Sequence, residues 1–181
     1  EKSEKNHSLS TNDLNYLIDA LDNSERPALL IGSGVRSANA IEDLKTFLDK
    51  YPIPVTYSGS APDTFGLENP LSIGSVGMMG CSRAGNLTVQ NSDLLLVFGS
   101  RLNTMTTGED FLKFARKAKI IIIDIDSVEH SKDSIKIDKL INADLKDVLS
   151  KLNQNSSIKK YKHWREKCYH WKKLFPKFEN N

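Results

Sequence analysis

The stretch LLIGSGVRSANAIEDLKTFL, residues 29–48, joins a short apolar run to a Gly-Ser-Gly turn and then to a helical pattern. An unbroken apolar run is typical of a strand that is covered on both faces, as in parallel sheets. Ile41, Leu44, Phe47 and Leu48 fall on one face of the helix predicted after the turn. The stretch therefore predicts a β-α unit with a glycine turn at the carboxyl end of its strand.

The same alternation continues on both sides of this unit. Strands that alternate with helices of about ten residues indicate a parallel sheet with helices on both faces, an α/β doubly wound fold. The stretch 58–91 is rich in Gly, Ser, Pro and Asn, so we expect an irregular connection of the kind that is often functional. The further predicted strands lie at 53–57, 93–99 and 119–126, and the further predicted helices at 9–24, 109–118 and 145–152.

The composition favours an ordinary globular protein. A chain of 181 residues with 39% hydrophobic and 27% charged residues suits one domain with short extensions. Because 25 Lys and Arg nearly balance 23 Asp and Glu, we predict no nucleic acid and no membrane partner. Two distant cysteines and a polar start without a signal peptide predict a cytoplasmic protein. The first residue is Glu rather than Met, so we expect either a processed chain or a segment excised from a longer one.

The glycine turn has two interpretations. Backbone N–H groups at the carboxyl edge of a parallel sheet can hold a phosphate, and Gly32, Ser33 and Gly34 stand at that position. The turn can equally be a tight bend without a ligand. Ser37 replaces the third glycine of the dinucleotide fingerprint, and no acidic residue ends the strand 53–57, so a standard NAD site is disfavoured.

Polar residues also follow two later strands. The segment 99–101, Gly-Ser-Arg, follows one strand, and Arg101 suits either a phosphate contact or a surface ion pair. Asp124 and Asp126 follow the next strand, where they suit a ribose hydroxyl, a metal ion or simple turn capping. Three strand ends would thus present nucleotide-compatible groups on one edge of the sheet.

The order of short blocks along the chain is more specific than any one of them. GSG, NPLSIGSVGMMG, SDLLLVFGSRLN, IIDID and NAD follow one another between Gly32 and Asp144. Over about residues 10–152 this order resembles the central domain of thiamine-diphosphate-dependent enzymes, most closely the acetolactate synthase branch. The resemblance implies a Rossmann-like sheet of six mostly parallel strands, of the NAD/FAD-binding type. It also implies a flexible segment at 1–9, the central domain at 10–152, and a linker and basic-aromatic helix at 153–181 that leads to a missing carboxyl-terminal domain.

In that family the domain holds FAD, an ADP-like nucleotide or nothing. By resemblance, the residues that would bind such a cofactor surround its pyrophosphate, its flavin and ribityl part, and its adenosine. They are Gly32, Ser33, Gly34, Ser58, Gly59, Ser60, Gly77, Met78, Gly99, Ser100, Arg101, Asp124, Ile125, Asp144 and Leu145.

The chain also departs from the flavin-holding pattern. Gly59 and Ser60 replace a Leu-Met pair, Met79 stands where His is usual, Asn103 replaces Asp, and Met105 stands near a usual Arg. Each exchange removes apolar cover or a polar contact from a flavin.

The resemblance further implies the chemistry of a parent enzyme. Such a parent binds thiamine diphosphate and Mg²⁺ in flanking pyrimidine-binding and diphosphate-binding domains, decarboxylates a 2-oxo acid, transfers the two-carbon unit and forms homo-oligomers. No GDG motif occurs here, so we expect this chain alone to lack the catalytic residues. The alternatives are a stand-alone NAD(P) or FAD module without thiamine chemistry, and a domain that has lost its ligand.

The remaining features have plainer interpretations. The tail 158–177 interleaves aromatic and basic residues, which can bind RNA or an acidic membrane, but we expect its aromatic stripe to pack against a following domain. We expect His130, which follows the Asp-Ile-Asp turn, to be an exposed turn residue, and the alternative is a place near a nucleotide. His163 and His170 lack a third metal ligand, and Cys81 lacks a neighbouring base.

Overall fold

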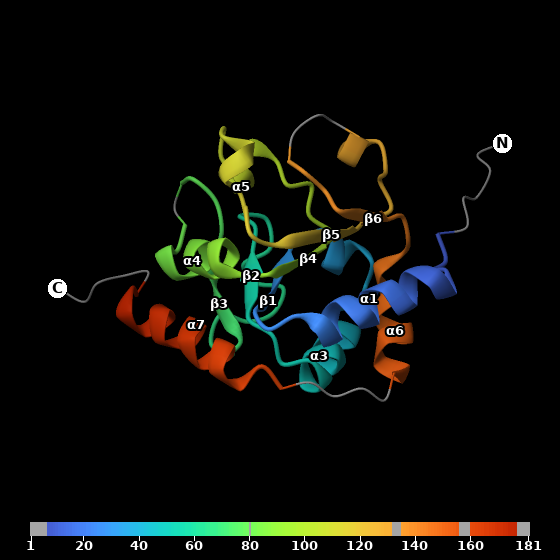
Figure 1. The fold of residues 1–181 in the computed structure, drawn as a ribbon, viewed down its shortest axis with the longest axis horizontal. Helices are drawn as coiled ribbons and strands as arrows, with labels where there is room; N and C mark the ends of the chain where they lie inside the picture. Colours follow the sequence, from blue (N-terminus) through green and yellow to red (C-terminus); the bar gives the residue numbers. More distant parts are fainter. Residues whose placement is uncertain (1–6, 80, 132–134, 156–159, 177–181) are drawn as a thin grey trace.

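A six-stranded sheet, all of it parallel, forms the centre of the molecule in the computed structural model, which describes residues 7–79, 81–131, 135–155 and 160–176. The strand order β3-β2-β1-β4-β5-β6 confirms the predicted doubly wound α/β fold (Figure 1). The strands are β1 (Pro27–Ile31), β2 (Val55–Tyr57), β3 (Ser72–Ser75), β4 (Leu94–Phe98), β5 (Lys119–Ile123) and β6 (Lys139–Ile141).

The central strands are apolar without a break because both of their faces are covered. Every residue of β1 and β4 is buried, and Leu29 of β1 pairs in register with Leu96 of β4. Leu29 and Ile31 belong to one apolar layer, while Ala28 and Leu30 belong to the other. The sheet therefore separates two cores, which is the arrangement that favours continuous apolar strands.

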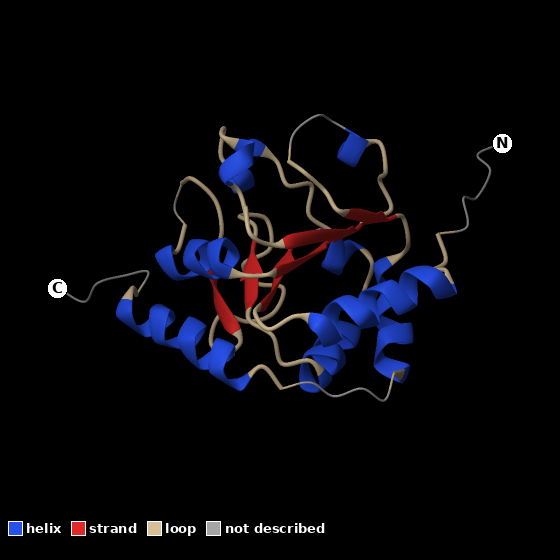
Figure 2. Ribbon diagram, in the orientation of Figure 1, coloured by secondary structure: helices blue, strands red, loops and turns tan. Residues whose placement is uncertain are grey.

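Helices cover both faces of the sheet. Figure 2 shows α1 (Thr11–Asn23), α3 (Ile41–Lys50) and α6 (Leu145–Gln154) grouped on one side and α5 (Thr104–Thr107) on the other. Ser10 caps the start of α1, since its hydroxyl accepts the N–H of Asp13 at 3.1 Å. A further short helix, α2 (Gly34–Ser37), directly follows the glycine turn. None of the helices within the described ranges is both long and apolar enough to cross a membrane.

Two predictions of local structure were wrong. The stretch 109–118 contains only the 3-10 turn η1 (Phe111–Lys113), because Phe114 and Ala115 are drawn into the second core and Ala115 adopts a φ of 44°. The irregular stretch 58–91 contains β3 and α4 (Arg83–Asn91). A methyl group on Gly85 of α4 would lie 2.4 Å from a carbonyl oxygen of β3, so only small residues allow α4 to pack this closely on β3. Because small polar residues give no apolar periodicity, the sequence pattern did not predict these two elements.

The carboxyl-terminal helix α7 (Lys162–Leu174) packs on α4 and β3 of the same domain. The indole N–H of Trp164 donates to the carbonyl of Pro27 at 2.8 Å, and the Tyr161 hydroxyl donates to the carbonyl of Leu21 at 2.8 Å. Tyr161, Trp164 and Cys168 are buried. The expectation that this stripe faces a following domain is therefore wrong for these three side chains. Part of the predicted linker, residues 156–159, lies outside the described residues.

Candidate functional site

The carboxyl edge of the sheet has a switch point between β1 and β4, where the strand order reverses. In open parallel sheets this is where ligands bind. The structure brings together here two segments that the sequence singled out, 32–34 after β1 and 99–101 after β4. The N–H of Gly32 donates to Phe98 O at 2.9 Å, and that of Gly34 donates to Gly99 O at 3.0 Å.

These glycines are required by the close approach of two backbones. A Cβ on Gly34 would lie 2.5 Å from Gly99 Cα, and one on Gly32 would lie 2.2 Å from Gly99 O. Gly99 itself has a φ of 57°, a conformation that favours glycine. The N–H groups of Gly32 and Gly34 both donate within the protein, so the geometry supports the tight-bend interpretation of the turn.

A cavity of about 120 Å³ opens beside the switch point, and we name it the strand-end cavity. It collects residues from the connections after β1, β4, β5 and β6, which are far apart in the sequence. Six of the predicted cofactor-binding residues line it, namely Gly34, Gly99, Asp124, Ile125, Asp144 and Leu145, together with Ser37, Ala38, Ile123 and Ala143.

Asp124 of this cavity is paired with a buried histidine. His130 Nε2 lies 3.2 Å from Asp124 Oδ2, and the His130 side chain is only 2% exposed, so the predicted exposure of His130 was wrong. Burial raises the pKa of Asp124, but the hydrogen bonds from His130 and from the N–H of Asp126 outweigh it and hold the pKa below its ordinary value. Asp124 is therefore an ionised acceptor in a largely dry setting.

The other acidic residues of this edge act as caps. Asp126 accepts the N–H of Glu129 at 3.1 Å, and Asp144 begins α6 by accepting the N–H groups of Lys146 and Asp147. This is the turn and cap chemistry that was one of the alternatives for Asp126. The described part of the chain contains no group of three or more His, Cys, Asp or Glu side chains arranged for a metal ion.

A second cavity, of about 360 Å³, lies at the carboxyl ends of β2 and β3, and we name it the hydroxyl cavity. Ser58, Gly59 and Ser60, which the resemblance assigned to a flavin, line it, and the hydroxyls of Ser58 and Ser60 lie 3.0 Å apart. Burial raises the pKa of Tyr57 at its wall. None of its described lining residues is charged; the others are Pro62, Ser75, Val76, Met79, Cys81, Asn103, Met105 and Thr106.

The two cysteines have no sign of a nucleophilic role. Cys81 lies at the hydroxyl cavity, and its thiol donates to Met79 O at 3.0 Å. Burial raises the pKa of Cys168 to about 12, so its thiolate form is strongly disfavoured.

The remaining predicted residues are spread around the same edge. Gly77 is clamped by the Asn86 side chain, which accepts its N–H at 3.1 Å and donates to its carbonyl at 3.0 Å. Ser100 is buried, whereas Met78 and Arg101 are exposed. Gly77 and Met78 line a separate hollow of about 220 Å³.

Exposed apolar side chains gather on the connections that leave the carboxyl ends of β3, β4 and β5. Met78 is 54% exposed, Met79 74% and Val128 74%, and the N–H of Met78 donates to Met105 O at 3.0 Å. Large exposed apolar side chains at the edge of a sheet are available for contact with another domain.

The sequence of this chain matches a known family over most of its length. The family described as "Thiamine pyrophosphate enzyme, central domain" matches residues 14–152. The chain belongs to this family. The suspected resemblance is thereby confirmed, and helix α7 lies beyond the matched range.

Individual relatives carry names from the acetolactate synthase branch. The chain is 38% identical over 154 residues to the "Probable acetolactate synthase large subunit" of Methanocaldococcus jannaschii, covering 83% of this chain and 26% of that protein. It is 33% identical over 162 residues to the "Acetolactate synthase large subunit" of Cyanidium caldarium, covering 84% and 27%. It is 38% identical over 120 residues to the "Acetolactate synthase 3, chloroplastic" of Brassica napus, covering 66% and 18%. The chain thus spans about a quarter or less of these relatives.

Sequence reasoning missed the pairing of His130 with Asp124 and two further side chains at this edge. His130 is six residues beyond Asp124, a spacing that carries no periodic signal. Arg36 and Asp63 form a two-point ion pair that joins α2 to the connection after β2. They are 27 residues apart, so only the meeting of β1 and β2 in the sheet brings them together.

Proposed function

We propose that the chain is the nucleotide-holding central domain of a longer, acetolactate synthase-like enzyme. That enzyme would use thiamine diphosphate and Mg²⁺ in other domains to decarboxylate a 2-oxo acid and transfer the two-carbon unit. The observation that carries the proposal is the pair of cavities at the switch-point edge of a sheet that belongs to this family.

The residues of the strand-end cavity fit the adenosine part of a nucleotide. Ile125 and Leu145 offer apolar surface for a base. Asp144 uses one carboxylate oxygen, Oδ1, for both of its capping bonds, which leaves the other as an acceptor for a ribose hydroxyl. Asp124 and Asp144 together make this cavity acidic, so the phosphates would lie outside it.

The hydroxyl cavity fits a neutral ring that makes hydrogen bonds at its edges. Tyr57, Ser58 and Ser60 supply hydroxyl groups, while Val76 and Met105 supply apolar walls. FAD would place its flavin there, and its chemistry in this domain would be structural or weakly redox-active rather than catalytic. An ADP-like nucleotide would place its adenosine in the strand-end cavity and would leave the hydroxyl cavity unused.

The exposed methionines and valine of the carboxyl edge support contact with flanking domains of the same polypeptide. We place the parent in the cytoplasm, as a homo-oligomer with a small 2-oxo acid as substrate. The greater length of the relatives favours this proposal over a stand-alone dinucleotide module.

A titration tests the proposal directly. The purified chain is scanned for flavin absorbance and then titrated calorimetrically with FAD, ADP and NADPH. We expect FAD or ADP to bind at micromolar strength or better, and Asp144→Asn to weaken binding while keeping the cap, because Asn also caps helices. Asp49→Asn, on an exposed position of α3, is the matched control. If every ligand fails to bind, the domain serves assembly alone.

A further inference from the structure

The phosphates of a nucleotide at this edge need a partner other than the glycine turn. The N–H groups of Gly32, Gly34 and Gly99 all donate to backbone carbonyls, at 2.9, 3.0 and 3.1 Å. The strand-end cavity carries the carboxylates of Asp124 and Asp144, which repel anions. Because these three N–H groups are already used, a basic side chain is the group best suited to hold an anion here.

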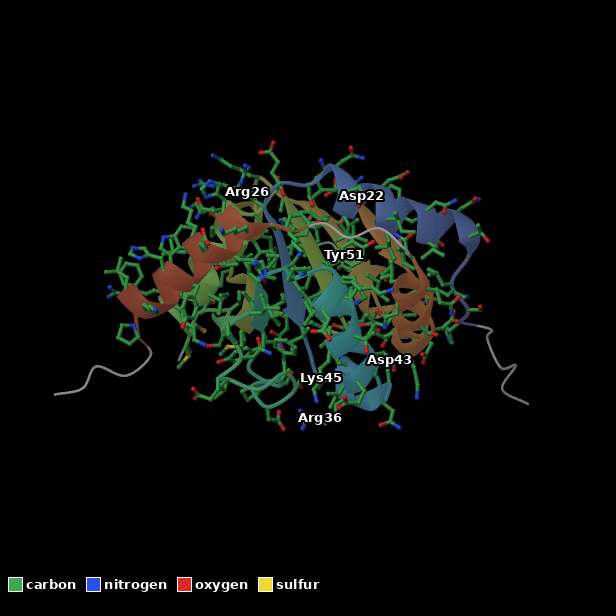
Figure 3. The ribbon with its side chains drawn as sticks, turned by 90° about the horizontal axis from the view of Figure 1, so that it is seen from below. Asp22, Arg26, Arg36, Asp43, Lys45 and Tyr51 are labelled. Carbon is green, nitrogen blue, oxygen red and sulfur yellow. The ribbon has the colours of Figure 1, made fainter. Side chains whose placement is uncertain are left out.

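Arg36 occupies the position where such a side chain is needed. Figure 3 places Arg36 at the carboxyl end of β1 and Arg26 at the opposite end. Its neighbour Ser37 lines the strand-end cavity, and its own Nη2 donates to the carbonyl of Ser60, which lines the hydroxyl cavity. Arg36 lines neither cavity itself, but its backbone adjoins a residue of the first and its guanidinium bonds to a residue of the second.

The guanidinium of Arg36 is already bound to an anion from its own chain. Nη1 donates to Asp63 Oδ2 at 2.9 Å and Nη2 donates to Asp63 Oδ1 at 3.0 Å. This two-point geometry is the one with which arginine binds phosphate groups. The two side chains are 49% and 65% exposed, and exposed ion pairs add little net stability, so the carboxylate can be exchanged at small cost.

We propose that Arg36 is the phosphate-binding side chain of this site and that Asp63 is an internal substitute for the phosphate, displaced when a nucleoside diphosphate binds. The proposal rests on the nucleotide-holding function proposed above. In this proposal Asp63 is regulatory, because its carboxylate competes with the phosphate for Arg36. Its ion pair also links the connection after β2 to α2 when no nucleotide is bound. Displacement would free that connection, which forms the wall of the hydroxyl cavity.

The test compares ADP, adenosine and inorganic pyrophosphate as probes of the full chain and four variants. We expect Arg36→Gln to weaken ADP binding about tenfold or more and to leave adenosine binding unchanged, since a charge-assisted bond is lost. We expect Asp63→Asn to strengthen ADP and pyrophosphate binding severalfold. Arg26→Gln is the matched control, because Arg26 is similarly exposed at the other edge.

The double variant Arg36→Gln/Asp63→Asn separates competition from simple repulsion between Asp63 and the ligand. We expect the gain from Asp63→Asn to vanish when Arg36 is absent, and a gain that persists would overturn the proposal. Equal ADP affinity in the wild type and Arg36→Gln, with adenosine still bound, would overturn it too but leave the nucleotide function standing. If neither the wild type nor any variant binds any of the three probes, and FAD also fails to bind, both proposals are wrong.

Discussion

Two short glycine-containing turns leave neighbouring strands of this domain, and they have opposite surroundings. In Gly32-Ser33-Gly34, after β1, an added methyl group would collide with the backbone of the connection after β4. In Ser58-Gly59-Ser60, after β2, a methyl group on Gly59 would meet nothing within 4 Å. The first turn is tightly packed against the connection after β4, whereas the second borders the hydroxyl cavity. We call the surroundings of the first turn the closed half of the carboxyl edge and those of the second turn the open half. Glycine is therefore required by close backbone packing in the first turn, whereas in the second turn it faces open space.

Helix α7 packs on β3, whose residue Ser75 lines the hydroxyl cavity, and truncation of its buried indole gives the largest expected effect. We expect Trp164→Ala to lower the free energy of unfolding by about 3–5 kcal/mol, because it deletes a buried indole and its bond to Pro27. Urea denaturation measures the change. Tyr169→Ala, on the exposed side of α7, is the control and should change it by less than about 0.5 kcal/mol. Equal losses would show that α7 is not part of this domain's core.

The closed half is tested at its tightest contact. We expect Gly34→Ala to cost about 2–3 kcal/mol, because the methyl group can be accommodated only if the connections after β1 and β4 separate. Denaturant midpoints, with the denaturant dependence checked for constancy, give the value. A change below about 0.5 kcal/mol would mean that the two backbones can part freely.

Asp124 and His130 provide a pH test of the closed half. Because the pKa of Asp124 is lowered from 3.8 in the folded protein, its stabilising contribution is present above about pH 3.8 and is lost as the pH falls through the folded-state pKa. We expect Asp124→Asn to cost about 1–2 kcal/mol near pH 6. The difference from the wild type should shrink in urea titrations below pH 3.8. A difference that does not vary with pH would assign the cost to packing rather than charge.

The smallest effect is expected in the open half. Gly59→Ala should change the free energy of unfolding by less than about 0.5 kcal/mol, since the methyl group meets open space. The substitution also reduces the conformational entropy of the unfolded chain, which favours the folded state. The same denaturation series as for Gly34→Ala measures it. A loss as large as that of Gly34→Ala would remove the distinction between the two turns.

Most of the fold could be predicted because its strongest signals are local. The buried runs of β1, β4 and β5 and the amphipathic pattern of α3 appear in the sequence as unbroken or periodic apolar residues. The strand β3, with the sequence Ser-Ile-Gly-Ser, was missed because small polar residues stand where α4 approaches closely. Six residues that the sequence singled out line the strand-end cavity, but the contacts that they make were not predicted.

The sequence by itself determined the parallel sheet, the family and the edge at which glycines and carboxylates follow the strands. These properties depend on apolar periodicity and on short blocks in a fixed order, which are written along the chain. Only the tertiary structure decided that the N–H groups of Gly32 and Gly34 are used internally, that His130 is buried against Asp124, and that Arg36 meets Asp63. Those facts depend on which strands become neighbours and how closely their connections approach, and neither is encoded in local spacing.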